Sequence, residues 1–175
     1  MIFLTLGTQQ PFDRLVRAVD RWCAAGGTDE VLAQIPDPGP RGYRPTRFDW
    51  TTWIAPDEYR ARFASARFVI AHAGMGSLIT AMTLAKPILV MPRRAHLGEQ
   101  RNDHQLATAQ RFGGKPGIHV AMDEDELVAA ADRLAAAPDG AEVLRIGPFA
   151  EDRLTDGLRA AIASARRTET MSRTQ

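Results

Sequence analysis

The sequence predicts an α/β fold with a doubly wound parallel sheet (Rossmann-like). Short apolar runs, typical of buried strands, alternate along the chain with segments of helical periodicity. This alternation indicates strand–helix–strand units, which place helices on both faces of a parallel sheet. The length of 175 residues fits one domain with a core of its own. We therefore expect one domain over residues 1–165, followed by a polar, disordered tail over residues 166–175.

The amino-terminal elements follow from local pattern. The apolar run Ile2–Leu6 is the first expected strand, and Gly26-Gly27 ends the helix that follows it. Val31–Ile35 and Thr46–Trp50 are the next two expected strands, and the loop 36–45, rich in proline and glycine, separates them. The first helix has one apolar face at helical spacing, formed by Leu15, Val16, Val19, Trp22 and Cys23.

The carboxyl-terminal elements continue the alternation. Asp123 and Glu126 have the spacing of a capping box before a helix with Leu127, Val128, Ala131, Leu134 and Ala135 on its buried face. A final helix carries Leu154, Leu158, Ala161, Ile162 and Ala165. The other expected elements are a helix at Asp57–Ala66, a strand at Phe68–Ala71, its helix at Ser77–Ala85, a strand at Pro87–Met91, a helix from about Asp103 and a short strand at His119–Ala121.

Composition excludes several classes of protein. The net charge of +1 gives no reason to expect nucleic acid as a partner. The single cysteine, Cys23, excludes an internal disulfide and fits a reducing compartment. The start of the chain has no pattern of a signal peptide. Residues 68–85 carry no formal charge, but the polar and glycine residues among them favour a buried strand–turn–helix over a membrane span.

Two polar motifs follow strands of the predicted sheet. The sequence AHAGMGS (Ala71–Ser77) turns a strand into a helix, whose free N–H groups and dipole favour a diphosphate. The second motif is the run GEQRNDHQ (Gly98–Gln105). In a sheet of order 3-2-1-4-5-6, the carboxyl ends of strands one and four lie at the ligand crevice. Those ends are Gly7-Thr8-Gln9 and residues 73–77, so we expect a nucleotide-sugar site there.

Other interpretations compete with this one. A dinucleotide-binding turn would need a third glycine where Ile79 stands, which disfavours NAD(P). An isolated histidine such as His72 is more often a core residue than a catalyst. The polar run would also be explained by a solvated loop with Asn102 or Asp103 as a helix N-cap. Helix capping explains the acids at residues 123–126, and we expect no metal.

These motifs resemble glycosyltransferase family 28, specifically the carboxyl-terminal, donor-binding half of its GT-B fold. The resemblance spans roughly Ile2–Val120 and is closest to the PssE/EpsE-type exopolysaccharide glycosyltransferase subunits. The matching stretches occur in order: FLTLGTQQPFDRLVRAVD (Phe3–Asp20), AHAGMGS, and KPILVMPRRAHLGEQRNDHQLATA (Lys86–Ala109).

The resemblance implies which residues hold a UDP-sugar. The glycine turn lines the diphosphate, the second motif reaches the sugar, and the end of the first strand lies across the cleft. Thr80 stands where many family members place a glutamate on the ribose hydroxyls. The substrate-binding residues expected in this way are Gly7, Thr8, Gly74, Met75, Gly76, Ser77, Thr80, Arg93, Glu99, Asn102, His104 and Gln105.

The resemblance further implies an inverting, metal-independent transfer that uses no cofactor. A hexose or glucuronic acid would move from a UDP-sugar to a lipid-diphosphate-linked saccharide in surface polysaccharide biosynthesis. A membrane-anchored PssD-like partner subunit would supply the general base and recruit this cytoplasmic chain to the inner face of the cytoplasmic membrane. His72 and His104 are the candidate bases within the chain, and Arg93 and Arg94 are candidates to pair with a glucuronate carboxylate.

Two functions of other classes remain open. The chain is alternatively a non-catalytic regulatory subunit that binds a nucleotide-sugar, or an NAD(P)-binding oxidoreductase domain. Binding of UDP without transfer would indicate the first, and preference for NAD(P) over UDP would indicate the second.

Overall fold

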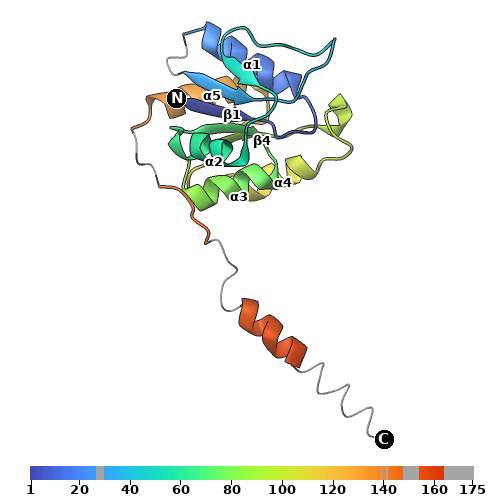
Figure 1. The fold of residues 1–175 in the computed structure, drawn as a ribbon, viewed down its shortest axis with the longest axis vertical. Coiled ribbons are helices and arrows are strands. Elements are labelled where there is room, and N and C mark those ends of the chain that lie inside the picture. Colours follow the sequence, from blue (N-terminus) through green and yellow to red (C-terminus); the bar gives the residue numbers. More distant parts are fainter. Residues whose placement is uncertain (27–29, 139, 141, 148–153, 164–175) are drawn as a thin grey trace, which may run out of the picture. The chain divides into compact units, whose positions relative to one another are not determined.

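A computed structural model describes residues 1–26, 30–138, 140, 142–147 and 154–163 (Figure 1). The chain divides into two compact units, Met1–Arg145 and Ile146–Gln175. The first unit contains β1 (Ile2–Thr5), α1 (Asp13–Ala24), β2 (Val31–Gln34), β3 (Asp49–Thr51), α2 (Pro56–Ser65), β4 (Val69–His72), α3 (Met75–Leu84), β5 (Ile88–Met91), the 3-10 helix η1 (Ala95–Leu97), α4 (His104–Phe112), β6 (Ile118–Val120) and α5 (Glu124–Ala136).

The six strands form one parallel sheet in the order β3-β2-β1-β4-β5-β6. This confirms the predicted fold class and strand order. The central register places Leu4 opposite Ile70 and Ile70 opposite Leu89. All carboxyl ends of the strands therefore lie along one edge of the sheet, where ligands of such folds bind.

Successive side chains of each strand point to opposite faces, so both faces of the sheet are buried. Helices α1 and α5 cover the face that carries Ile2, Leu4 and Ile70. Residues of α2, α3 and α4 cover the face that carries Phe3 and Val69. Figure 1 shows the same two layers of helices on either side of the sheet.

The expected third strand, Thr46–Trp50, is displaced toward the carboxyl end, because β3 spans Asp49–Thr51. The displacement is caused by a contact with Asp20 of α1. The backbone N–H groups of Thr46 and Arg47 donate to the buried carboxylate of Asp20, at 3.0 and 2.8 Å. These two amides therefore cannot take part in a strand ladder.

The predicted capping box of α5 is confirmed with one shift. Asp123 Oδ1 accepts from the N–H groups of Asp125 and Glu126, at 3.1 and 2.8 Å. The Glu126 carboxylate, however, accepts from the N–H of Met122 at 2.7 Å, one residue before the N-cap.

Cys23 lies on α1 and packs, half-buried, against the core. Burial raises the pKa of its thiol to about 11, and the charge of Asp20 adds to the effect. The expected packing role of Cys23 agrees with this position. Gly27 of the pair expected to end α1 lies outside the described residues.

In the second unit, residues 154–163 are helical, as the sequence predicts. Leu154, Leu158 and Ile162 are each more than half exposed on this helix. Ala165, the expected domain end at residue 165 and the expected tail 166–175 lie outside the described residues. Of the helices that the structure describes, none combines the length and the apolar character of a transmembrane span.

Candidate functional site

A cavity of about 630 Å³ opens at the carboxyl ends of the strands. It brings together the segment after β1, the last residue of β4, the polar loop after β5 and the start of α4. Its lining residues are Leu6, Gly7, Thr8, Gln9, Gln10, His72, Arg93, Gln100, Arg101, Asn102, His104 and Gln105. Six of the twelve expected substrate-binding residues are among them: Gly7, Thr8, Arg93, Asn102, His104 and Gln105.

A second cavity, of about 550 Å³, lies at the opposite edge of the sheet, and Met1, Arg67 and Lys86 are among its lining residues. These residues precede strands rather than follow them. We take the carboxyl edge as the candidate site, because ligands of open parallel sheets bind there and both polar motifs end there.

His72 lies at the floor of the first cavity between two glycines. A side chain on Gly7 would come within 3.7 Å of the imidazole Cε1, and a Cβ on Gly74 would overlap the ring. Gly74 is therefore required by the packing of His72, beyond any contact with a ligand. Gly7 adopts the left-handed region, with φ of 70°, which permits the turn after β1.

Burial, together with the nearby charge of Arg93, lowers the pKa of His72 to about 4, although the backbone of Thr5 acts weakly in the other direction. The imidazole is therefore neutral at pH 7. Its buried Nδ1 makes no hydrogen bond within the described part of the chain. His72 thus presents an uncharged polar ring to the cavity.

Arg93 is 3% exposed and supplies a positive charge beside His72. Its guanidinium donates to the carbonyl oxygens of Pro11 and Gln10, each at 2.6 Å, and lies 4.6 Å from the centre of the Phe12 ring. Burial lowers the pKa of Arg93 to about 10, so the group stays charged at neutral pH. Arg93 therefore fixes the segment after β1 against the end of β5.

The glycine turn becomes the first turn of α3, beside His72. Its N-cap is Gly74, which has no side chain to accept from the helix amides, and the first turn holds no acid. Met75 is exposed, and a Cβ on Gly76 would meet no atom within 4 Å. The amino end of α3 thus leaves N–H groups and a dipole end for an outside anion. Helix α5 differs, because Asp123 and three acids of its first turn occupy that end.

Ser77 and Thr80 lie further along α3. Ser77 is 7% exposed, whereas the Thr80 hydroxyl donates to the carbonyl oxygen of Gly76 at 2.8 Å. Neither lines the cavity among its described lining residues. The assignment of both residues, and of Gly74–Gly76, to a bound donor remains a prediction.

The polar loop between β5 and α4 closes on itself. Gln105 Oε1 accepts from the N–H of Arg93 at 3.1 Å, and Asp103 Oδ1 accepts from the N–H of Ala95 at 2.9 Å. Asp103 is the N-cap of α4 by position, yet its side chain makes no capping bond. The loop is therefore folded by side chains that a simple N-cap would leave in solvent.

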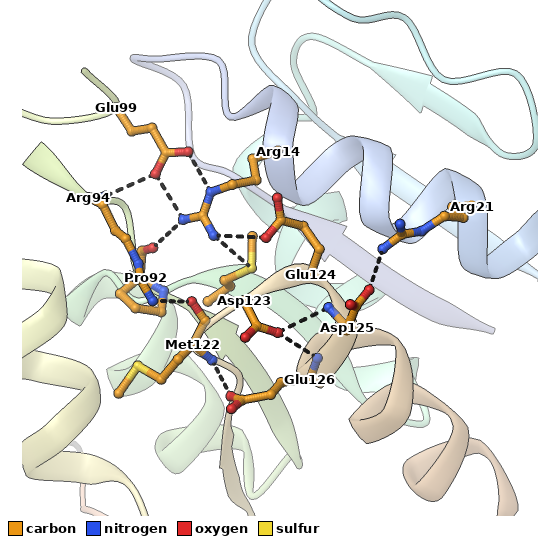
Figure 2. A network of polar contacts seen from close by, with 11 residues as sticks. Arg14, Arg21, Pro92, Arg94, Glu99, Met122, Asp123, Glu124, Asp125 and Glu126 are labelled. Carbon is orange, nitrogen blue, oxygen red and sulfur yellow. Dashed lines mark hydrogen bonds and ion pairs between the residues drawn. The ribbon is translucent and has the colours of Figure 1, made fainter. Parts of the chain in front are cut away.

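Glu99, in the middle of this loop, points toward α1. Its carboxylate accepts from Arg14 at 2.7 and 2.9 Å and from the N–H of Arg94 at 2.9 Å (Figure 2). Arg94 in turn donates to the carbonyl oxygen of Met122 at 2.6 Å. Substrate binding by Glu99 stays a prediction, and so does the pairing of Arg93 and Arg94 with a glucuronate carboxylate; Arg94 Nε makes no hydrogen bond among the described residues.

Six lining residues were not in the expected substrate-binding set: Leu6, Gln9, Gln10, His72, Gln100 and Arg101, of which His72 was a candidate base. The positions of the other five, directly after β1 and within the second motif, are the signal that identifies them. Arg14 had no such signal, because it lies 78 residues from Pro92 and 85 residues from Glu99 along the chain. Only the fold brings the three residues together.

Comparison with known proteins supports the fold. No protein-family profile and no curated protein sequence matches the chain. Solved structures do match. The glycosyltransferase of kitacinnamycin matches at 21% identity and a TM-score of 0.58, over 78% of this chain and 35% of that one. The calicheamicin glycosyltransferase CalG4 matches at 20% identity and a TM-score of 0.52, over 77% of this chain and 34% of that one. The solution structure of ALG13 matches at 19% identity and TM-score 0.53, over 90% of this chain and 93% of that one.

The chain spans about a third of the length of the two glycosyltransferases that it matches. The matched structures include glycosyltransferases of the GT-B class, and the fold is the Rossmann-like α/β fold of their carboxyl-terminal half. The predicted fold is thus confirmed, including its assignment to half of a GT-B architecture.

Proposed function

We propose that this chain is the donor-binding, catalytic subunit of a two-component glycosyltransferase of the PssE/EpsE type. The subunit binds a UDP-sugar at the carboxyl edge of its sheet, and the reaction is inverting and independent of metal. A membrane-anchored, PssD-like partner completes the active site and recruits the chain to the inner face of the cytoplasmic membrane. The acceptor is a lipid-diphosphate-linked saccharide in surface polysaccharide biosynthesis.

One observation carries the proposal. The amino end of α3 is uncapped and free of acids, and it carries a glycine for which the described fold has no need. Gly76 does not adopt a positive φ, and a Cβ there would meet no neighbour. Glycine in a helix costs roughly 1 kcal/mol relative to alanine. An outside group that must approach the backbone closely, such as a diphosphate, explains a glycine in this place.

The chemistry follows from the groups at this edge. The N–H groups and dipole of α3 stabilise the negative charge of the diphosphate, which grows as UDP departs. Arg93 adds a fixed positive charge, whereas neutral His72 adds a polar atom without further charge. A base must take the proton of the acceptor hydroxyl, and we assign it to the partner. The transferred sugar is a hexose or glucuronic acid, and Arg93 and Arg94 are candidates to pair with a glucuronate carboxylate.

The amino end of α3, residues 74–77, is the proposed diphosphate seat. Its test is Gly76→Ala, with binding of UDP measured by calorimetry without added metal. The added methyl group should leave the fold as stable as before or more stable, by up to about 1 kcal/mol. It should weaken UDP binding by about ten-fold or more. The matched control is Gly157→Ala, a helical glycine of the second unit where a Cβ also meets nothing. Equal UDP affinity in wild type and Gly76→Ala would place the diphosphate elsewhere.

The test of the reaction is transfer from a panel of UDP-hexoses and UDP-glucuronate, by the chain co-expressed with a candidate membrane partner. Transfer that needs both subunits is the expected result. UDP binding without transfer by any pair would indicate a regulatory subunit instead. Preference for NAD(P) over UDP in the binding assay would indicate an oxidoreductase domain.

A further inference from the structure

Arg14 of α1 is one of the residues that attach the loop 92–103 to the rest of the fold. Its Nε and Nη2 donate to the two carboxylate oxygens of Glu99 at 2.7 and 2.9 Å, which is a bidentate pair (Figure 2). Nη2 also donates to the carbonyl oxygen of Pro92 at 3.0 Å. Arg14 thus holds the loop at its start and at its middle.

The pair with Glu99 is more than a surface contact. The side chains of Arg14 and Glu99 are 13% and 14% exposed, so solvent screens their interaction only partly. A third group, the Glu124 carboxylate of α5, lies 3.4 Å from Arg14 Nη1. Bidentate geometry of this kind requires the planar guanidinium, which lysine does not provide.

Glu99 also organises the loop itself. Its carboxylate accepts from the N–H of Arg94, and its own N–H donates to the carbonyl oxygen of Arg94 at 3.2 Å. The segment 94–99 is therefore a closed turn with the ion pair at its end. The residues that follow directly, Gln100, Arg101 and Asn102, line the cavity together with His104.

The amino end of α3 depends on different contacts. None of the hydrogen bonds and ion pairs found for Arg14 among the described residues reaches the segment 74–77. Loss of Arg14 should therefore disturb the rim formed by residues 100–104 and spare the diphosphate seat.

We infer that Arg14 is a positioning residue for the sugar of the donor: through Glu99 it holds residues 100–104 where they contact the sugar. This inference rests on the proposed function. Its consequence is a selective defect, because the sugar contacts depend on Arg14 and the diphosphate contacts do not.

The experiment compares the affinities of wild type and Arg14→Met for UDP and for the UDP-hexose that wild type binds best. Arg14→Met should weaken the UDP-sugar by about ten-fold and UDP by less than about two-fold. Arg14→Lys should restore little of the lost affinity for the UDP-sugar, because lysine cannot form the bidentate pair. The control is Arg21→Met, which removes an α1 arginine whose pair with Asp125 is exposed (59% and 94%). It should change neither affinity.

Two further measurements separate positioning from general damage. Glu99→Gln should also weaken binding of the UDP-sugar more than binding of UDP. The double variant Arg14→Met/Glu99→Gln should bind the UDP-sugar little more weakly than either single variant. Amide hydrogen exchange of residues 100–104 in the ligand-free protein should be faster in Arg14→Met, whereas exchange in α3 should stay as in wild type.

Equal weakening of UDP and UDP-sugar by Arg14→Met, or unchanged exchange at residues 100–104, would overturn the inference while leaving the proposed function intact. A wild-type protein that binds neither UDP nor any UDP-sugar would overturn the proposed function, and this role of Arg14 with it.

Discussion

Helix α1 holds two long loops with side chains of opposite charge. Asp20 holds the loop 35–48, between β2 and β3, and Arg14 holds the loop 92–103, between β5 and α4. The Asp20 carboxylate is 4% exposed and accepts from the hydroxyl of Tyr43, at 2.6 Å, and from two backbone amides. Arg14 instead pairs with the charged side chain of Glu99, which directly precedes the cavity-lining Gln100.

The difference separates a loop that a buried carboxylate fixes from a loop that we propose contacts a ligand. A buried carboxylate surrounded by donors fixes a backbone path, and its loss leaves several polar groups without partners. A partly exposed ion pair contributes less to stability but determines where the next residues lie. We therefore expect changes at Asp20 to lower stability and changes at Arg14 to alter binding.

The largest effect on stability should come from Asp20→Ala. The change leaves the Tyr43 hydroxyl and the amides of Thr46 and Arg47 without their acceptor, so the free energy of unfolding should fall by about 3 kcal/mol. Urea unfolding measures the loss, and Asp37→Ala is the control in the same loop. The side chain of Asp37 is 70% exposed, so its removal should cost about 0.5 kcal/mol or less.

The UDP affinity of Asp20→Ala tests whether the loop held by Asp20 and the loop held by Arg14 have separate roles. Under conditions where Asp20→Ala is fully folded, its affinity for UDP should match that of wild type. A selective loss of UDP binding in this variant would mean that the two loops do not have separate roles.

Protonation of His72 at acid pH should lower the free energy of unfolding of the protein. Its pKa is about 4 in the folded state, below the ordinary 6.5, so the unfolded chain binds the proton more readily. The contribution of neutral His72 is complete above pH 6.5 and decreases as the pH falls toward 4. Between pH 7 and pH 5, wild type should lose about 2 kcal/mol more unfolding free energy than His72→Gln. Parallel pH profiles of the two proteins in urea titrations would contradict this.

The smallest effect expected is that of Tyr43→Phe. Phenylalanine keeps the ring, which lies 4.1 Å from the Arg17 guanidinium, but removes the hydroxyl bond to Asp20. The unfolding free energy should fall by about 1 kcal/mol. Tyr59→Phe is the matched comparison, because its hydroxyl lies 3.4 Å from Thr5 Oγ1, a longer and weaker contact. An unchanged unfolding free energy in Tyr43→Phe would show that the hydrogen bond between Tyr43 and Asp20 does not stabilise this loop.

Local pattern was sufficient for the centre of the sheet, because β1, β4 and β5 are apolar runs. The order of the six strands followed from the fold class and is confirmed, and Asp123 caps α5 as predicted, whereas Glu126 accepts from the N–H of Met122. The third strand was placed too early, since the buried Asp20 that takes the amides of residues 46 and 47 is 26 residues away along the chain. No local pattern reports such a contact.

The candidate site was predictable only in part for the same reason. Residues that follow directly on a strand, such as Gly7 and Thr8, were found because topology alone brings them to the cavity. Arg14 was not found, because its pairing with Glu99 spans 85 residues and involves a side chain on a helix face. The reason for Gly74 also needed the structure, which shows the His72 ring where a Cβ would lie.

The thiol of Cys23 has a practical consequence for fluorescence spectroscopy. Because burial raises the pKa of this thiol to about 11, very little of the reactive thiolate is present at neutral pH. Maleimide dyes should therefore spare Cys23, the only cysteine of the chain, and label a cysteine introduced at an exposed position. Leu97, at the tip of η1 and 51% exposed, is such a position. Leu97→Cys would carry a dye that reports movement of the loop in the otherwise natural protein.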